Sequence, residues 1–87
     1  MFRVLFSVEA ERELADLDAA VRRRVLKRLG WLASNLHEVR LEALAGGPPN
    51  LFKARVGDYR VLFDVYHDDQ VILVHVVGHR SQVYRRR

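Results

Sequence analysis

Apolar residues recur at steps of three and four along the first part of the chain, the spacing of one face of an α-helix. This stripe consists of Ala10, Leu14, Leu17, Val21, Val25, Leu29, Leu32 and Leu36. Ser7 precedes the stripe and Asp18 interrupts it, and both residue types are favoured at the N-cap of a helix. We therefore predict a hairpin of two helices, preceded by a short strand at residues 2–6.

The second half of the chain has the pattern of a β-meander. A loop rich in glycine and proline at residues 45–50 ends the helical region. Strand-like runs follow at 51–56, 59–66 and 71–77, separated by turns at 57–58 and 68–69. The order predicts an α+β fold, βααβββ, with the helical hairpin packed on one face of a twisted, mainly antiparallel four-stranded sheet. The other face is expected to be open.

Length and composition indicate one small domain over residues 1–87. Without cysteine the chain has no disulfide framework and no thiolate zinc ligands, so we expect a cytoplasmic protein. No apolar run approaches the roughly 18 residues of a membrane span, and we expect no membrane partner. Fifteen Lys and Arg against 11 Asp and Glu give a net charge of +4. Such a charge favours an anionic partner, either nucleic acid or an acidic protein.

Side-chain alternation places Lys53 and Arg55 on the sheet face away from the helices. With a two-residue turn at Gly57–Asp58, Arg55 lies opposite Arg60, and Lys53 opposite Leu62. Three cations are therefore expected to converge on one face of the sheet.

The same register, continued to the last strand, places Val77 opposite Arg60 and brings His79 and Arg80 to the rim of this patch. Like charges directly opposite each other destabilise an antiparallel pair, which indicates that an anion neutralises them. Phosphate is the best candidate, because arginine binds it through two parallel hydrogen bonds. The alternative is that these cations only solvate an open sheet face.

Two segments carry a resemblance to a known family. They are 51–65, with the turn Gly57-Asp58-Tyr59-Arg60, and 76–84, with Gly-His-Arg at 78–80 followed by Val83-Tyr84. In these segments, in length and in the order of elements, the chain resembles the RelE family of bacterial and archaeal toxins. The resemblance implies a type II toxin-antitoxin system, in which the toxin enters the ribosomal A site and cleaves the bound mRNA. It also implies an acidic antitoxin that covers the toxin.

The resemblance also implies a set of catalytic residues: Lys53, Arg55, Arg60, Arg80 and Tyr84. The implied reaction is attack of a ribose 2′-hydroxyl on the adjacent phosphate, which needs neither a metal nor a cofactor. Lys53 and Arg60 would stabilise the charged transition state, and Arg80 would contact the leaving oxygen or the scissile phosphate. Tyr84 would stack on a base or orient the 2′-hydroxyl.

One position departs from the family pattern. Other members carry a lysine, proposed as the general base, where this chain has Arg55, and arginine stays protonated at any physiological pH. His79 is the candidate acid or base in its place. The alternative is that His79 is a turn residue without a role in catalysis.

The weaker candidates are basic residues predicted to bind RNA: Arg22, Arg23, Lys27, Arg85 and Arg86. The alternative for Arg22, Arg23 and Lys27 is a solvated helix face. The alternative for Arg85 and Arg86 is a frayed tail. Trp31 is predicted to pack against other apolar residues. The histidines show no metal-ligand spacing, so no metal site is expected.

Two other functions stay open. One is a ParE-like toxin that poisons DNA gyrase, and the other is a RelE homologue that binds RNA or antitoxin without cleaving RNA. The expected partners are the ribosome with its mRNA and a cognate antitoxin with an acidic or amphipathic helix, in a heteromeric complex.

Overall fold

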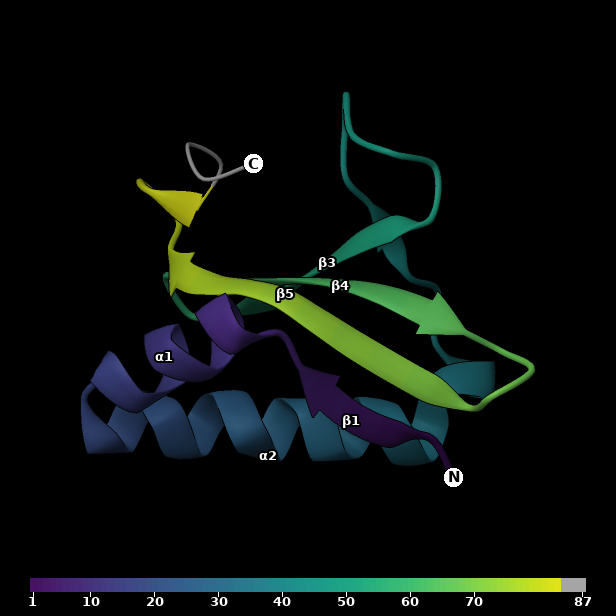
Figure 1. Ribbon diagram of the computed structural model, residues 1–87, viewed down its shortest axis with the longest axis horizontal. Coiled ribbons are helices and arrows are strands. Elements are labelled where there is room, and N and C mark those ends of the chain that lie inside the picture. The colour runs from purple at the N-terminus through teal and green to yellow at the C-terminus, as the bar shows by residue number, and fades with distance from the viewer. Residues whose placement is uncertain (84–87) are drawn as a thin grey trace.

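Two helices cover one face of a five-stranded sheet in the computed structural model, which describes residues 1–83 (Figure 1). The elements in chain order are β1 (Arg3–Phe6), α1 (Val8–Asp16), α2 (Ala19–Asn35), the 3₁₀ turn η1 (Leu36–Glu38), β2 (Glu42–Ala43), β3 (Leu51–Val56), β4 (Tyr59–Tyr66) and β5 (Val71–His79). Within residues 1–83, none of the helices has the length and apolar character needed to cross a membrane.

Both predicted helix caps are confirmed. The Ser7 side chain accepts a hydrogen bond from the backbone N–H of Ala10 at 3.1 Å, which starts α1. Asp18 accepts from the N–H of Ala20 at 3.1 Å and starts α2. Each bond satisfies a backbone donor that the first helical turn leaves unpaired. The hydrophobic stripe is therefore divided into a helical hairpin rather than carried by one long helix.

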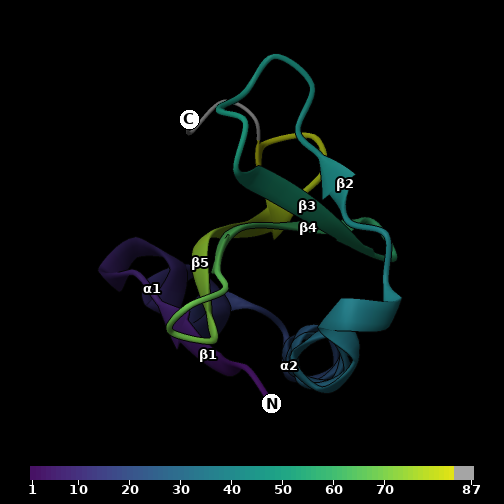
Figure 2. The same cartoon turned by 90° about the vertical axis from the view of Figure 1, so that its right-hand side faces the viewer.

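The sheet has the strand order β1-β5-β4-β3-β2, with β1 parallel to β5 and the other pairs antiparallel (Figures 1 and 2). The α+β fold and the helical layer are as predicted, but the prediction of four strands is wrong. The fifth strand, β2, has only two residues, Glu42 and Ala43. Two residues are too few to show the alternation by which a strand is recognised.

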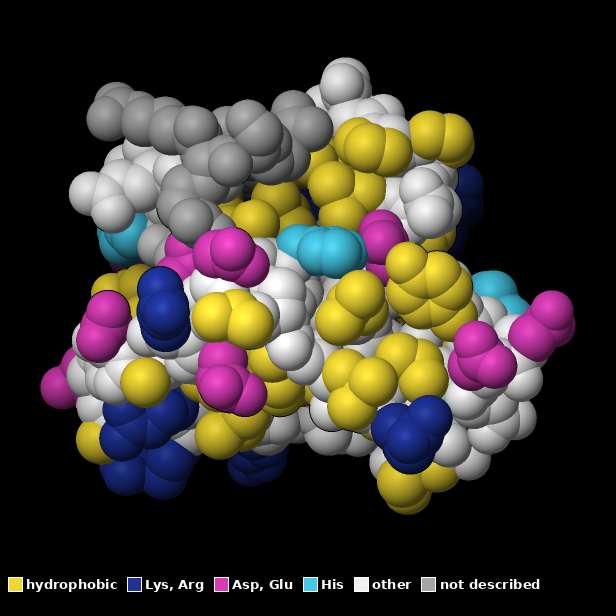
Figure 3. Space-filling view, in the orientation of Figure 1, with side chains coloured by type: hydrophobic (Ala, Val, Ile, Leu, Met, Phe, Trp, Pro, Cys, Tyr) yellow, Lys and Arg dark blue, Asp and Glu magenta, His cyan; other side chains and the backbone are white. Residues whose placement is uncertain are grey.

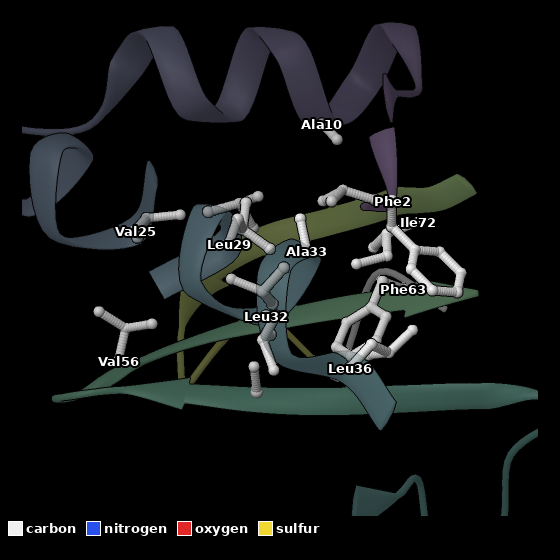
Figure 4. Packing of buried hydrophobic residues seen from close by; sticks show 14 residues of the cluster. Phe2, Ala10, Val25, Leu29, Leu32, Ala33, Leu36, Val56, Phe63 and Ile72 are labelled. Atoms are coloured by element: carbon white, nitrogen blue, oxygen red, sulfur yellow. The ribbon is translucent and has the colours of Figure 1, made fainter. Parts of the chain in front are cut away.

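The main core lies between the helices and the sheet (Figure 4). Leu29 and Leu32 of α2 pack against Phe63 of β4 and Ile72 of β5, and all four side chains are almost completely removed from solvent. Burial of each such side chain contributes about 1.5–3 kcal/mol. This core holds the sheet rigid beneath the face that carries the cations.

The prediction that the opposite face of the sheet is open is wrong. This face carries a second, smaller apolar cluster. Its buried members are Leu44, Leu51, Leu62, Val76 and Val83. Leu44 belongs to the segment after β2, and Figure 2 shows the connection from β2 to β3 rising from the sheet on the side away from α1 and α2. The exposed part of this face is therefore narrower than the sheet itself.

Candidate functional site

The pairing of β3 with β4 confirms the predicted grouping of three cations. Arg55 lies opposite Arg60 and Lys53 lies opposite Leu62, because Gly57–Asp58 closes the hairpin as a two-residue turn. Gly57 has a φ of 59°, which glycine adopts without the strain that other residues meet. The side chains between these residues along both strands belong to the core under the helices, so the cations project from the other face.

The register between β4 and β5 changes partway along the strands. Phe63 pairs with Val74, but Leu62 pairs with Val76, so His75 is an extra residue in β5. This arrangement is a β-bulge, in which two residues of one strand oppose one residue of the other. A bulge breaks the period of two on which the predicted register depends.

The bulge corrects two predicted positions. Gly78, rather than Val77, lies opposite Arg60, and His79 pairs with Tyr59. The ring centroids of Tyr59 and His79 are 5.4 Å apart in an edge-to-face contact. Both line a hollow of about 280 Å³ with residues of α1, among them Glu13. His79 thus lies on the helical side of the sheet and not in the patch with the cations.

Lys53 and Arg55 share one carboxylate, that of Glu42. Arg55 donates from Nε to Oε1 at 3.2 Å and from Nη2 to Oε2 at 3.0 Å, and Nζ of Lys53 lies 3.3 Å from Oε2. The hydrogen bonds from Arg55, helped by Lys53, lower the pKa of Glu42 from 4.5 to about 2. A carboxylate of the chain itself therefore offsets the repulsion between Arg55 and Arg60. The predicted neutralising anion is thus present in the chain itself, as the Glu42 carboxylate instead of a phosphate.

The guanidinium group of Arg60 is turned into the β3–β4 turn. Arg60 is only 8% exposed, and its Nη1 donates to the carbonyl oxygens of Gly57 at 2.8 Å and Tyr59 at 2.9 Å. A buried cation is tolerated because these acceptors replace water. Arg60 therefore fixes the turn and adds positive charge beneath the surface.

Arg80 approaches the same turn from the end of β5. Its backbone N–H donates to the carbonyl of Asp58 at 2.8 Å, and its Nε lies 3.9 Å from Oδ1 of the same residue. The Arg80 side chain is 62% exposed. Arg55, Arg60 and Arg80 thus gather at the Gly57–Asp58 turn, with Lys53 further along β3. The predicted site residue Tyr84, with Arg85 and Arg86, lies outside the described residues.

The predicted RNA-binding residues of α2 have different environments. Arg22 donates from Nη1 to the carbonyl oxygens of Leu17 at 3.0 Å and Ala15 at 3.3 Å, so it satisfies acceptors at the end of α1. Arg23 and Lys27 are exposed. Figure 3 shows basic side chains gathered at the lower left, over the end of the helical layer where α2 begins. Arg22 is therefore held in place by the hairpin, whereas Arg23 and Lys27 are accessible to a partner.

The prediction that Trp31 packs against other apolar residues is wrong, because its side chain is 46% exposed. The guanidinium carbon of Arg28 lies 4.9 Å from the centroid of the Trp31 ring. Arg24 and Lys27 line the same shallow hollow of about 350 Å³. An exposed indole among cations is typical of surfaces that stack nucleobases.

A polar group on the face away from the helices has no counterpart in the sequence interpretation. Nε2 of His75 lies 2.9 Å from Oδ2 of Asp64, and the Tyr66 hydroxyl donates to the same oxygen at 3.3 Å. The charge of Asp64 raises the pKa of the Tyr66 phenol, because a second negative charge beside it is unfavourable. His75 reaches this face by the ordinary alternation of side chains after Val74, which belongs to the core under the helices.

Within residues 1–83 no three His, Asp or Glu side chains converge in a way that could hold a metal ion. Guanidinium and ammonium groups at the end of a rigid sheet can bind a phosphodiester and stabilise the charge that develops during its cleavage.

Comparisons with known proteins agree with this fold. The family model described as the ParE toxin of the type II toxin-antitoxin system, parDE, matches residues 4–84. No curated protein sequence matches the chain.

Several solved structures are similar over nearly the whole chain. The isolated RelE toxin of E. coli has a TM-score of 0.78 at 22% identity, covering 99% of this chain and 98% of that one. The toxin-antitoxin complex RelBE2 from Mycobacterium tuberculosis gives a TM-score of 0.78 at 26% identity, covering 92% of both chains. The archaeal RelE-RelB complex from Pyrococcus horikoshii gives 0.71 at 28% identity, covering 94% of this chain and 98% of that one.

Proposed function

Because the chain belongs to the ParE toxin family of type II toxin-antitoxin systems, we propose that it is a ribosome-dependent endoribonuclease that cuts mRNA and inhibits translation. The observation that carries the nuclease proposal is the gathering of cations at one end of the sheet. Arg55 and Arg60 face each other across β3 and β4, Arg80 binds the turn between them, and Lys53 lies on the same face.

The proposed reaction is attack of a ribose 2′-hydroxyl on the adjacent phosphate, which leaves a 2′,3′-cyclic phosphate and a free 5′-hydroxyl. It proceeds without a metal ion. Lys53 and Arg60 stabilise the negative charge on the phosphate oxygens, because fixed cations need no reorganisation during the reaction. Arg80, which is exposed, contacts the scissile phosphate or the leaving oxygen. Tyr84 stacks on a base or orients the 2′-hydroxyl, and Arg55 adds charge without accepting a proton.

The proposed partners are the ribosome, its mRNA and an antitoxin, all in the cytoplasm. The solved relatives include complexes of RelE with RelB, which supports an antitoxin here. A partner with an acidic or amphipathic helix suits a chain of net charge +4. Arg23 and Lys27, with the exposed ring of Trp31, form a basic surface on α2 for ribosomal RNA, and Arg55 lines the same hollow as Lys27 and Trp31.

The test is primer extension on an mRNA that is being translated. We expect cuts in codons at the A site with the wild-type chain and none with Arg80→Ala. Arg12→Ala is the matched control, since it removes an exposed arginine from α1, and it should cut as the wild type does. Absence of cuts with the wild type would contradict the proposal.

A second candidate is a ParE-like toxin that poisons DNA gyrase. The name of the matching family model favours it, as does an arginine at position 55, which cannot serve as a base. This function predicts inhibition of supercoiling by purified gyrase and no cuts in mRNA. A homologue that binds RNA or antitoxin without catalysis would give neither result.

A further inference from the structure

A hollow of about 520 Å³ lies on the sheet face away from the helices, within the size range of small-ligand sites. Its apolar floor is formed by Leu51, Leu62 and Val76, and Asp64 and His75 supply polar groups at its wall. Figure 3 shows imidazole, acidic and apolar side chains side by side across the middle of the visible face. The hollow therefore combines an apolar surface with groups that can exchange a proton.

The bulge in β5 places Val76 on the same face as His75, beside this hollow. Val74 belongs to the core under the helices, whereas Val76 belongs to the apolar cluster on the opposite face. His75, the extra residue between them, lines the hollow together with Val76. In a regular strand two adjacent side chains point to opposite faces, and a bulge allows both to share one face. His75 therefore keeps the face that regular alternation after Val74 gives it, and the bulge adds Val76 as an apolar neighbour of the imidazole.

Asp64 holds the imidazole in one orientation. Its side chain is only 15% exposed, against 38% for His75, so the carboxylate is largely shielded and the ring is accessible. The bond of 2.9 Å from Nε2 to the carboxylate keeps the proton on Nε2 when the ring is neutral. Nδ1 then carries a lone pair, and it has no hydrogen-bond partner among residues 1–83. A base held by a carboxylate in this way is the arrangement that general-base catalysis requires.

We propose that His75 is the general base of the RNA cleavage reaction and that Asp64 is its positioning residue, an inference that rests on the proposed nuclease function. Nδ1 of His75 takes the proton from the 2′-hydroxyl, O2′ forms a bond to phosphorus, and the bond from phosphorus to O5′ breaks. The Lys53 ammonium gives a proton to O5′. Solvent returns the proton from the imidazolium to the lysine, so the step balances without another reactant.

The register supports this division of roles. Leu62 lies between Lys53 on β3 and the bulge of β5, so Lys53 and His75 flank it on the same face. Two strand spacings separate their Cα atoms by roughly 10 Å, and the Lys53 ammonium, which lies 3.3 Å from Oε2 of Glu42 on β2, turns toward Leu62 when it meets the phosphate. In-line displacement places the attacking and leaving oxygens on opposite sides of phosphorus. A base and an acid that flank one phosphate meet this requirement, and His79 on the helical side of the sheet does not.

The charged and titratable groups around His75 come from two strands and a helix. Asp64 and Tyr66 face it from β4, Glu9 of α1 lines the same hollow, and Lys53 lies beyond Leu62 on β3. A protonated imidazole has no lone pair at Nδ1. Because the protonated form cannot act as a base, the cleavage rate should fall at low pH, as the acid limb of a pH–rate profile.

The experiment measures single-turnover cleavage of mRNA on ribosomes with a vacant A site, as a function of pH. His75→Gln keeps an amide that can donate to Asp64 but cannot take up a proton. We expect its rate to fall roughly 10²-fold or more, with loss of the acid limb. In Asp64→Asn, loss of the contact that orients the imidazole should lower the single-turnover rate by a smaller factor without changing the affinity for the ribosome. The matched control is His37→Gln, at an exposed histidine of η1, and it should behave as the wild type.

Thermal unfolding of each variant shows whether it folds. The pH dependence of the wild-type cleavage rate is measured without any variant. A wild-type rate that does not fall at low pH would overturn the inference even if His75→Gln were unstable. A folded His75→Gln that keeps the wild-type rate, or that changes only the affinity for the ribosome, would overturn it as well. In these cases the wild type still cuts mRNA and the proposed function stands. Failure of the wild type to cut would contradict both.

Discussion

Glu42 reaches diagonally across the β2–β3 pair to Arg55, two residues beyond its register partner Lys53. It thereby holds both cations with one carboxylate. Since β2 has only two residues, this contact also fastens the edge of the sheet. The same carboxylate would have to release Lys53 or Arg55 when a phosphate binds.

The Glu42 carboxyl group should titrate far below its ordinary range. Its pKa is lowered from 4.5 to about 2, so its contribution to stability is complete above pH 4.5 and is lost as the pH falls through about 2. NMR titration of the side-chain carboxyl measures this directly. In Arg55→Ala the pKa should rise toward 4.5, whereas Arg80→Ala should leave it unchanged. An unaltered Glu42 titration in Arg55→Ala would refute the contact.

Substitution of Arg60 and substitution of Arg80 should affect the stability of the protein differently, although both residues are proposed to act in cleavage. Arg60→Ala leaves two turn carbonyls without their buried donor, so the free energy of unfolding should fall by about 2 kcal/mol. The melting temperature should fall by roughly 10 °C. Arg80→Ala removes an exposed side chain and should change stability by less than about 0.5 kcal/mol. Equal melting temperatures in the two variants would contradict this assignment.

Gly57→Ala should destabilise the β3–β4 hairpin because the φ of 59° strains any residue with a Cβ, at a cost of about 1–2 kcal/mol. An added Cβ would also lie 2.6 Å from Nη2 of Arg24, the flexible end of a long side chain. We expect the Arg24→Ala/Gly57→Ala double variant to recover little stability, because the strain lies in the backbone. Full recovery in chemical denaturation would show that the steric contact dominates instead.

Arg22 and Arg23 are neighbours with different expected roles. Arg22→Ala removes the bonds to the end of α1 and should lower the free energy of unfolding by about 1 kcal/mol, with little effect on RNA affinity. Arg23→Ala should leave stability unchanged but weaken binding to ribosomes in a salt-dependent way. Equilibrium unfolding and ribosome binding at two salt concentrations separate these roles. Weaker ribosome binding by folded Arg22→Ala would restore its predicted part in RNA recognition.

The helices and turns could be predicted because their signals are local. Ser7 and Asp18 act as caps through bonds to residues two or three positions away, and Gly57–Asp58 forms the turn its residue types favour. The opposition of Arg55 and Arg60 followed from that turn alone. These features need no knowledge of the rest of the chain.

The errors concern contacts that no local pattern encodes. The partner of Arg55 is Glu42, 13 residues away on a strand of two residues. His75 is inserted as a bulge, so every register position beyond it is displaced by one residue. The opposition of Arg55 and Arg60 indicated that an anion lies near Arg55. It did not distinguish a carboxylate of the chain from a phosphate. The position of His79 relative to the cations followed from the same bulge.

The parallel pairing of β1 with β5 joins the first strand to the last one. While a nascent chain still lacks residues 71–79, β1 has no neighbour and the β3–β4 hairpin lacks the strand that carries it onto the helices. Such long-range closure is slow compared with helix formation. A partly synthesised chain therefore has no complete sheet, and Arg80 joins the cations at the β3–β4 turn only once β5 has been made.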